Sequence, residues 1–430
     1  PIGPVWAVQG ARRISRDPSV PASLVVLLML ATALGVIGSA FSSTLQQSQT
    51  DQAMYKSGSD LRIVRGSSQS LQNSELLDGF LTQHPGLGNI AYAYRAGGHL
   101  NTEGFVSTKT ATLAIDSAHL QSIAWYRNDF SSPYTIENLA NSIKPDNKPW
   151  ETDGITLPID SHGISLWVQP NRPYQILMLQ ARLRDSNGNY FDLPLGKLDH
   201  KNWQKHTVSY DALDNITPTR RRSASRFRNI LSFADLAPPF TLLALHLTSS
   251  TGLEESGAIF FSDLTSMQSE EESLAYNLDY MSKVHIIEDH THPGLYDLKL
   301  NTSVSNVQGS QSMRFGWSPG GNGLRGVRFG HKETPINAIV SEEILQSANA
   351  KVGDSITLGM SSYSLPIKIT SFTNYFPTLD PKLAPFVILD RTNFEYYSNM
   401  HSQRIAAGPT EIWGDFRDES ITTDMLIESL

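Results

Sequence analysis

The hydrophobic pattern is dominated by one apolar run from Ala22 to Phe41 that contains no charged residue. At about 1.5 Å per helical residue, this run spans roughly 30 Å, the thickness of the hydrocarbon core of a bilayer. The next Lys or Arg is Lys56, whereas the basic residues just before the run are Arg12, Arg13 and Arg16. The pattern predicts a cytoplasmic lead over residues 1–20 and a transmembrane helix over residues 21–43, with the rest of the chain outside.

Two other interpretations fit the same run. A secretory signal peptide also has a basic start and an apolar middle, and Gly38-Ser39-Ala40 resembles its small-residue cleavage site. However, the run exceeds the ~7–15 apolar residues of such a peptide. The third interpretation is a buried helix, but helices of soluble proteins rarely lack charge over about five turns. The membrane-spanning interpretation is therefore preferred.

The polar segment after the run contains good helix formers, which predicts a helical stalk over residues 44–58 with Gly58 as its C-cap. Alternating strand and helix patterns then predict the first half of an α+β core over residues 59–132. The expected strands are 60–66, 89–96 and 110–116, and the expected helices are 74–86 and 118–130.

From about residue 133 to 268 the hydrophobic pattern consists of short apolar or alternating runs, which are separated by turns rich in Gly, Asn and Pro. Such runs without a long helix predict an antiparallel β-sandwich, of jelly-roll or galactose-binding-like type. The six runs are 163–170, 174–185, 189–196, 203–213, 240–249 and 257–266. Mixed patterns return over residues 269–415, and residues 416–430 begin another helix. The predicted fold is one transmembrane helix plus an extracytoplasmic α+β domain interrupted by the sandwich.

Composition narrows the function classes. Charged residues make up 18% of the chain and the formal net charge is −8, which argues against a nucleic-acid partner. The absence of cysteine excludes disulfides, thiolate catalysis and Cys-ligated metal sites. No G-x-x-x-x-G-K-[ST] loop occurs, so these residues do not form an ATPase. We expect no cofactor and no enzymatic activity.

Two motifs suggest chemistry. Gly316-Trp317-Ser318-Pro319-Gly320 matches the G-x-S-x-G nucleophile elbow, but Pro319 lacks the N–H that the oxyanion hole requires, so a turn is the better interpretation. Glu288-Asp289-His290-Thr291-His292 is the best metal-ligand cluster, because alternate strand positions place both histidines on one face. No third or fourth ligand is evident, which favours a loop without metal.

Three further sets of residues each have a structural and a functional interpretation. Asp185, Asn187 and Asn189 have the spacing of half a calcium loop, but the twelfth position is Gly196, which favours a β-turn. Aromatic residues of the sandwich could stack on a sugar, although strand aromatics mostly pack in cores; these are Trp167, Tyr190 and Trp203.

A basic patch could bind anionic headgroups, glycans or a protein partner, although a solvated loop is the simpler interpretation; it contains Arg220, Arg221, Arg222, Arg226 and Arg228. The acidic residues Glu270, Glu271 and Glu272 are expected to begin a linker helix.

Two segments resemble the FtsX/MacB-type ABC transporter permeases. The first, residues 16–63, has the basic lead, apolar helix, stalk and strand of that family. The second, residues 334–394, has Val340-Ser341 before a helix, a turn at residues 351–354 and then Tyr375-Phe376-Pro377. The resemblance covers about residues 10–110 and 280–415. The sandwich lies outside the minimal family pattern and resembles a carbohydrate-binding module.

The resemblance implies a transmembrane permease subunit in the plasma (inner) membrane. A separate ABC ATPase on the cytoplasmic side would move the extracytoplasmic domain for export or mechanotransmission. It also implies that the chain is a fragment with further spans on both sides. The alternative is a membrane-anchored glycan-binding protein, with a glycan or lipid as ligand. A membrane-tethered hydrolase is weaker, because no complete catalytic set emerges.

Overall fold

The computed structural model describes residues 4–16, 19–64, 87–101, 107–131, 134–214, 233–249, 255–268, 272–276, 283–290, 292–301, 311–320, 324–405 and 408–416. The chain divides into two units, residues 1–57 and residues 58–430. The first unit contains α1 (Val5–Arg16) and α2 (Ser19–Ser57), and the second is mostly β.

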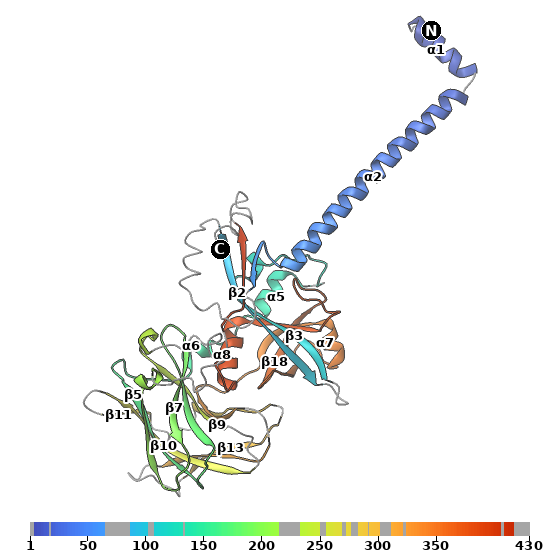
Figure 1. The fold of residues 1–430 in the computed structure, drawn as a ribbon. Helices are drawn as coiled ribbons and strands as arrows, with labels where there is room; N and C mark the ends of the chain where they lie inside the picture. Colours follow the sequence, from blue (N-terminus) through green and yellow to red (C-terminus); the bar gives the residue numbers. More distant parts are fainter. Residues whose placement is uncertain are drawn as a thin grey trace, which may run out of the picture. The chain divides into compact units, whose positions relative to one another are not determined.

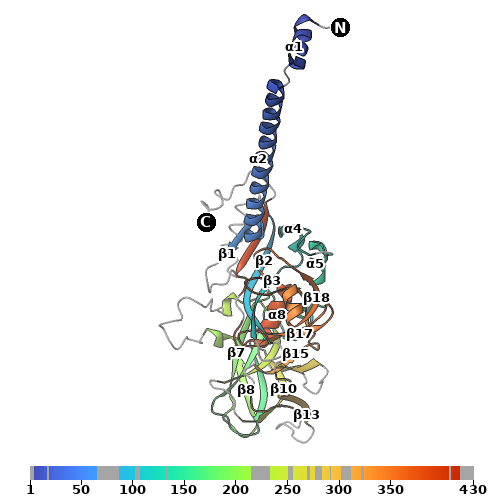
Figure 2. The ribbon, with the colours of Figure 1, turned by 90° about the vertical axis from the view of Figure 1, so that its right-hand side faces the viewer.

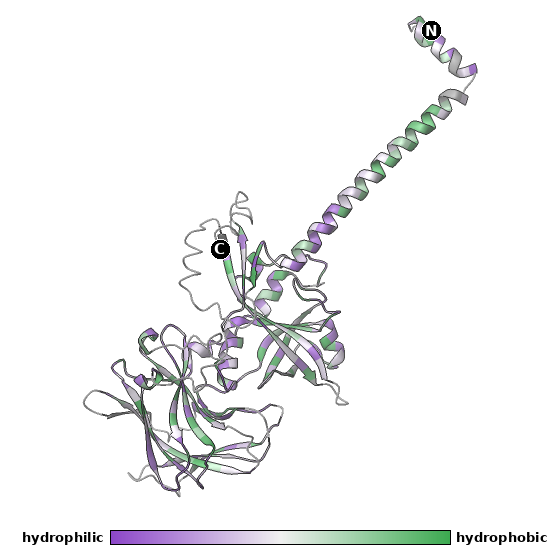
Figure 3. Cartoon of the chain, viewed as in Figure 1, coloured by the Kyte–Doolittle hydropathy of each residue, from purple (hydrophilic) through white to green (hydrophobic). Residues whose placement is uncertain are grey.

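Helix α2 is continuous over 39 residues and has two halves of different polarity. Figure 3 shows the apolar half nearer its N-terminus and the polar half nearer its C-terminus. Residues 22–57 are long and apolar enough to include a membrane span, and none of the most apolar window is buried. The helix ends before Gly58, whose φ of +91° suits a glycine at a helix C-terminus. This long apolar N-terminal helix suggests a signal sequence or a membrane anchor.

The core of the second unit is an eight-stranded mixed sheet in the order β1-β20-β2-β17-β18-β16-β19-β3 (Figure 1). Its strands are β1 (Leu61–Val64), β2 (Leu87–Asn101), β3 (Ser107–Ile115), β16 (Ile336–Ser341), β17 (Ser355–Gly359), β18 (Ser364–Thr373), β19 (Phe386–Asp390) and β20 (Glu411–Phe416). The pairs β16–β18 and β19–β3 are parallel. Strand β2 also pairs with β3, which closes β2, β17, β18, β16, β19 and β3 into a ring of pairings.

Both faces of this core sheet are covered, which explains why β16 and β19 are almost continuously apolar. Alternate residues point to opposite faces, so Ile339 and Ile388 contribute to one apolar cluster and Val340 and Leu389 to another. The first cluster includes residues of α4 and α5, and the second residues of α7 and α8. These helices are α4 (Leu120–Ile123), α5 (Ile136–Ser142), α7 (Glu342–Ser347) and α8 (Arg391–His401).

The inserted domain is a sandwich of two antiparallel sheets. One sheet has the order β13-β14-β10-β5-β8 with β11 also on β10, and the other has the order β12-β15-β9-β6-β7 with β4 on β9. The strands are β4 (Ile155–Thr156), β5 (Gly163–Pro170), β6 (Leu177–Arg184), β7 (Tyr190–Lys197), β8 (Gln204–Ser209), β9 (Thr241–Ser249), β10 (Gly257–Met267), β11 (Glu272–Tyr276), β12 (Val284–Ile286), β13 (Tyr296–Asn301), β14 (Ser312–Trp317) and β15 (Arg325–Phe329). Short helices α6 (Pro149–Thr152), η1 (Tyr210–Leu213) and η3 (Phe233–Asp235) flank the strands. Figure 2 shows the sandwich strands β7, β8, β10 and β13 below α8 and the core strands β1, β2 and β3 above it.

The strand pairing gives the insert bounds that differ from the expected 133–268. The sandwich strands extend from Ile155 to Phe329. The point where the chain leaves the core and the point where it returns are adjacent, since the Gly154 N–H donates to the Phe329 carbonyl at 3.0 Å. Helix α5, which we placed in the insert, packs Leu139 into the core cluster instead. Strands β12 to β15, which we placed in the second half of the core, pair with the sandwich. The alternation of apolar and polar residues identifies a strand but not the strand with which it pairs. For β14 and β15 these partners include β10 and β9, which lie far away in sequence.

The structure also differs from the helices expected at residues 118–130 and from Glu272 onwards. The expected helix over 118–130 is reduced to α4 followed by turns. Glu272 begins strand β11 and not a linker helix, because its backbone pairs with β10. The expected helix over residues 74–86 and the basic patch over residues 220–228 lie outside the described residues, as do Glu270 and Glu271. The expected terminal helix at 416–430 lies outside them too, except Phe416, which ends β20.

Candidate functional site

Helix α8 packs against both the core sheet and the sandwich. Phe394 and Tyr397 of α8 pack into the core cluster with strands β16 and β19. Tyr396 and Met400, on the other side of the same helix, pack against Leu243 and other residues on the outer face of the β12-β15-β9-β6-β7 sheet. Figures 1 and 2 both place α8 at this boundary. We call the contact between α8 and this sheet face the junction.

A row of polar side chains crosses the sheet face at the junction. Asp192 of β7 lies opposite Arg182 of β6, and Arg328 of β15 lies opposite His285 of β12, with Ala244 of β9 between the two arginines. Both arginine side chains are at most 2% exposed, although they occupy the face of the sheet that points away from the sandwich core. Buried charges require partners, because an unpaired ion loses its hydration without compensation.

Arg182 obtains its partners from two domains. Its Nε and Nη2 atoms each lie 2.8 Å from a carboxylate oxygen of Asp192, in a bidentate pair. Its Nη1 donates to the carbonyl of Asn399 and, at 2.8 Å, to the carbonyl of Ser402. These carbonyls lie at the C-terminal end of α8, where helix carbonyls lack intrahelical donors and the helix dipole favours a cation. A sandwich strand therefore caps a helix of the core.

Arg328, the second arginine in the row of polar side chains, also has several partners. Its Nη1 lies 3.4 Å from Asp153 and its Nε lies 3.2 Å from Glu333, and its Nη2 donates to the carbonyl of His331. Asp153 also accepts from the Tyr396 hydroxyl of α8 at 2.8 Å and from the His331 N–H at 3.0 Å. This network joins a segment before the sandwich, a sandwich strand and a core helix.

Glu333 connects Arg328 to the end of α8. Its Oε1 lies 2.7 Å from Nε2 of His401, whose ring stacks on Tyr397 with centroids 4.1 Å apart. Burial alone would raise the pKa of Glu333, but the charge and the hydrogen bond of His401, together with Arg328, lower that pKa to about 2. Glu333 therefore stays ionised at neutral pH and joins Arg328 to His401.

A second buried cluster lies where the chain enters the core sheet. Glu411 of β20 accepts from Nε of Arg95 on β2 at 2.7 Å and from Nη2 of Arg62 on β1 at 2.9 Å. The indole Nε1 of Trp413 donates to the same carboxylate at 3.0 Å. Burial raises the pKa of Glu411, but the hydrogen bonds from Arg95 and Arg62 lower it to about 2. One carboxylate thus joins three neighbouring strands.

The residues just after α2 are tightly fitted to this cluster. A Cβ on Gly58 would lie 2.8 Å from the Trp413 ring and 2.7 Å from Thr378, so no side chain fits there. Strand β1 runs antiparallel to β20, and the Phe416 N–H donates to the carboxylate of Asp60 at 3.3 Å. The chain after α2 and the end of β20 are therefore neighbours in the core sheet.

The structure separates the two histidines of the candidate metal cluster. Strand β12 ends at Ile286, so His290 and His292 lie in the following loop and not on one strand face. His292 lies 3.2 Å from Asp289 and its side chain is 55% exposed, whereas the His290 N–H donates to Ser364 of the core. Among the described residues, no group of three or more His, Cys, Asp or Glu is arranged to hold a metal ion.

The other two motifs are turns. Trp317 is a buried residue of β14, and after the turn at Ser318-Pro319-Gly320 the next described element is strand β15, where a nucleophile elbow requires a helix. Asp185 closes the β6–β7 hairpin by accepting from the Asn189 N–H at 2.7 Å and from the Asn189 side chain at 2.9 Å. Both carboxylate oxygens of Asp185 are thus used within the turn.

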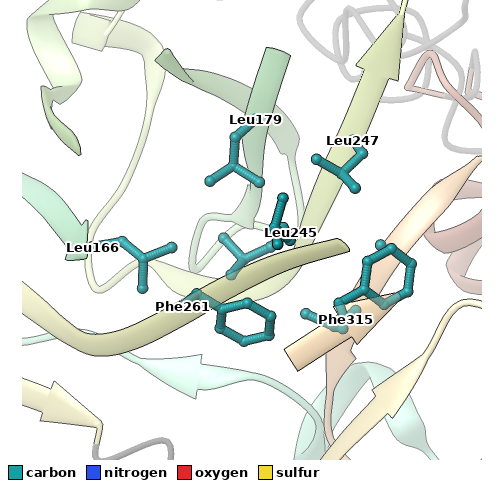
Figure 4. A pocket seen from close by; sticks show the side chains of 9 residues that line it. Leu166, Leu179, Leu245, Leu247, Phe261 and Phe315 are labelled. Atoms are coloured by element: carbon teal, nitrogen blue, oxygen red, sulfur yellow. The ribbon is translucent and has the colours of Figure 1, made fainter. Parts of the chain in front are cut away.

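The three aromatic residues considered for sugar stacking differ in burial. Tyr190 is buried at the junction, whereas Trp167 and Trp203 are half-buried. The pocket between the two sheets has a volume of about 10 Å³, which is about the size of one water molecule, and only apolar side chains and Gly326 line it (Figure 4). This pocket is a packing gap in the sandwich core and not a ligand site.

Comparison with known proteins adds no relative. No protein-family model matches the chain, no curated protein matches it, and no solved structure matches it.

Proposed function

We propose that the chain is part of an FtsX/MacB-type ABC transporter permease, with α2 as a transmembrane helix and residues 58–416 as its extracytoplasmic domain. In this proposal a separate ATPase binds on the cytoplasmic side, in the plasma (inner) membrane. ATP-driven motion tilts α2, and the polar half of the helix conveys the motion to the core sheet. The family assignment rests on the resemblance of residues 16–63 and 334–394 to that family.

The observation that carries the proposal is the continuity from α2 into the core sheet. The helix runs without a break through its apolar and polar halves to Ser57, and β1 begins four residues later. Strand β1 is then fixed through Arg62 to Glu411, which also binds Arg95 on β2. Within the second unit, Glu411 therefore joins three strands through partly buried ion pairs, beginning with the first strand after α2, and in this proposal a force on the helix follows this path.

The junction extends this path to the sandwich. Because Arg182 and the Asp153–Arg328 pair bind residues of α8, the sandwich is attached to the core by desolvated contacts. A module that only binds a glycan at the end of a tether would not need this attachment. The arrangement therefore favours a sandwich that moves with the core.

The proposal is tested with the full-length protein in detergent and in cells. We expect an ATPase subunit to co-purify with it, and we expect Gln49→Pro to abolish transport while the complex remains assembled, since proline breaks the polar half of α2. The matched control is Gln49→Ala, which keeps a good helix former at the same exposed position.

Three outcomes decide between the alternatives. Normal transport by Gln49→Pro would exclude coupling through α2. Absence of any ATPase partner, combined with binding to a glycan array, would favour the membrane-anchored glycan-binding protein. Cleavage after residue 40, detected by mass spectrometry of the mature protein, would show a signal peptide and exclude both membrane-bound functions.

A further inference from the structure

Five histidines gather at the junction or directly beside it. His246 lies on β9, His285 on β12, His290 in the loop after β12, His331 beside Asp153 and His401 at the end of α8. The rings of His290 and His401 have centroids 6.3 Å apart. The whole chain contains 12 histidines, so a large share of them lies at one internal contact.

The surroundings of these histidines already contain buried cations. The nearest charged groups of His246 are Arg182 and His401, both cationic when charged, and His246 itself is fully buried. Arg328 faces His285, with Glu333 and Asp153 as the nearby anions. His290 is faced by Glu333, His401, Glu288 and Asp289.

An added proton on His246, His285 or His290 has little compensation in the closed junction; Glu288, the carboxylate beside His290, lies 3.8 Å from its Nδ1 and is 56% exposed. Within the described part of the chain, the Nε2 atoms of His285 and His290 are buried and have no hydrogen-bond partner. The two best-placed anions are already engaged, because Asp153 binds Arg328, His331 and Tyr396, and Glu333 binds Arg328 and His401. Charging His246 or His285 places a further cation near Arg182 or Arg328, and charging any of the three rings in the closed junction costs hydration.

We propose that the junction is an acid-sensitive latch, in which protonation of His246, His285 and His290 releases the sandwich from helix α8. The latch does not depend on the permease function proposed above. Its stimulus is the pH around residues 58–416, which is the external pH if these residues lie outside the membrane.

The direction of the response follows from burial. Burial lowers the pKa of His246, His285 and His290 below the ordinary value of about 6.5, and Arg182 or Arg328 adds to this effect for the first two. A released junction restores ordinary pKa values, so it binds protons that the closed junction does not. The closed state is therefore fully favoured above about pH 6.5 and loses stability as the pH falls below it.

The test measures the distance between the two domains in the full chain in lipid nanodiscs. The chain has no cysteine, so Asn187→Cys in the sandwich and Lys368→Cys in the core, both exposed, give two unique sites for spin labels. At about pH 7.5 we expect one distance, and at about pH 5 we expect a second, longer distance whose population grows as the pH falls.

Neutral substitutions assign the response to the histidines. His246→Gln, His285→Gln and His290→Gln together should remove the long-distance population at pH 5, and His119→Gln, at an exposed histidine in the core, should leave it unchanged. Should the triple variant fail to fold, His285→Gln alone must reduce the population, since that ring is only half-buried. The latch is excluded by one unchanged distance at both pH values, by a long-distance population that is as large in His285→Gln as in the unmodified chain, or by loss of the near-ultraviolet circular dichroism signal at pH 5, which would mean global unfolding.

Discussion

Arg182 and Asp192 face each other across the β6–β7 hairpin and are joined by two parallel hydrogen bonds of 2.8 Å. The guanidinium is fully buried, whereas the carboxylate is 22% exposed. This pair fixes the plane of the guanidinium so that its remaining N–H groups point at the last carbonyls of α8. A hairpin of the sandwich thus orients a cap for a helix of another domain.

Removal of this cap should destabilise the extracytoplasmic unit. Arg182→Ala leaves Asp192 and two helix carbonyls without their donor, and we expect a loss of about 3 kcal/mol in the free energy of unfolding, measured with denaturant in detergent. Arg182→Lys should recover only part of it, because an ammonium cannot reproduce the bidentate geometry. The control is Arg127→Ala, which removes an exposed pair with Asp129 and should change little. Equal losses in both variants would contradict the role assigned to Arg182.

Glu411 predicts a defined pH dependence. Its pKa is lowered to about 2 in the folded chain, against 4.5 ordinarily, so its contribution is complete above about pH 4.5 and is lost as the pH falls towards 2. Glu411→Gln should therefore lower the melting temperature most at pH 5 and above, where we expect a loss of about 2 kcal/mol. The difference between the two proteins should shrink as the pH falls to about 3. A difference that is constant over this range would mean that the ionised carboxylate is not the stabilising group.

Gly330 supports the network around Asp153 by leaving space for it. A Cβ at this position would lie 2.2 Å from Cγ of Asp153, and φ is +139°. Gly330→Ala should therefore destabilise the chain by more than the roughly 1 kcal/mol of backbone strain alone, in a thermal unfolding measurement. Gly353→Ala isolates that strain, because Gly353 has φ of +104° and a Cβ added there would meet no atom within 4 Å. Similar melting temperatures for both variants would show that Asp153 moves aside freely.

Helix α2 should remain attached to the mature chain. An epitope tag placed before Pro4 should co-fractionate with the domain after alkaline extraction of membranes, because a retained span resists this treatment. Leu30→Arg, at the middle of the apolar half, should weaken insertion by about 3 kcal/mol and increase the extractable fraction. Leu45→Arg, in the polar half, is the matched control and should not. Loss of the tag from the fractionated domain would indicate signal-peptide cleavage.

Local patterns predicted most of the individual elements. In β5, Ile164, Leu166 and Val168 alternate with outward residues, and the three lie in the sandwich core as that pattern requires. The turn at Asp185 and the helix end at Gly58 follow equally from local chemistry. These features depend on neighbours within a few residues, which a single sequence contains.

The two buried clusters could not be predicted in the same way. Arg182 and Arg328 occupy strand positions that ordinarily face water, and only the arrival of α8 at that face makes them buried. Each arginine also has partners far away along the chain: Asp153 for Arg328, and the carbonyls of Asn399 and Ser402 for Arg182. A charged residue on the outer face of a strand has the same pattern whether water or another domain covers it.

The adjacency of Gly154 and Phe329 has a consequence for how this domain can vary. The chain leaves the core and returns to it at neighbouring positions, joined by one hydrogen bond of 3.0 Å. Neighbouring strands lie about 4.8 Å apart, a gap that a tight turn spans. The two ends are therefore close enough to be joined without the sandwich, and a replacement module would need two adjacent ends, a partner for the end of α8 and a cation for Asp153 and Glu333 in place of Arg328.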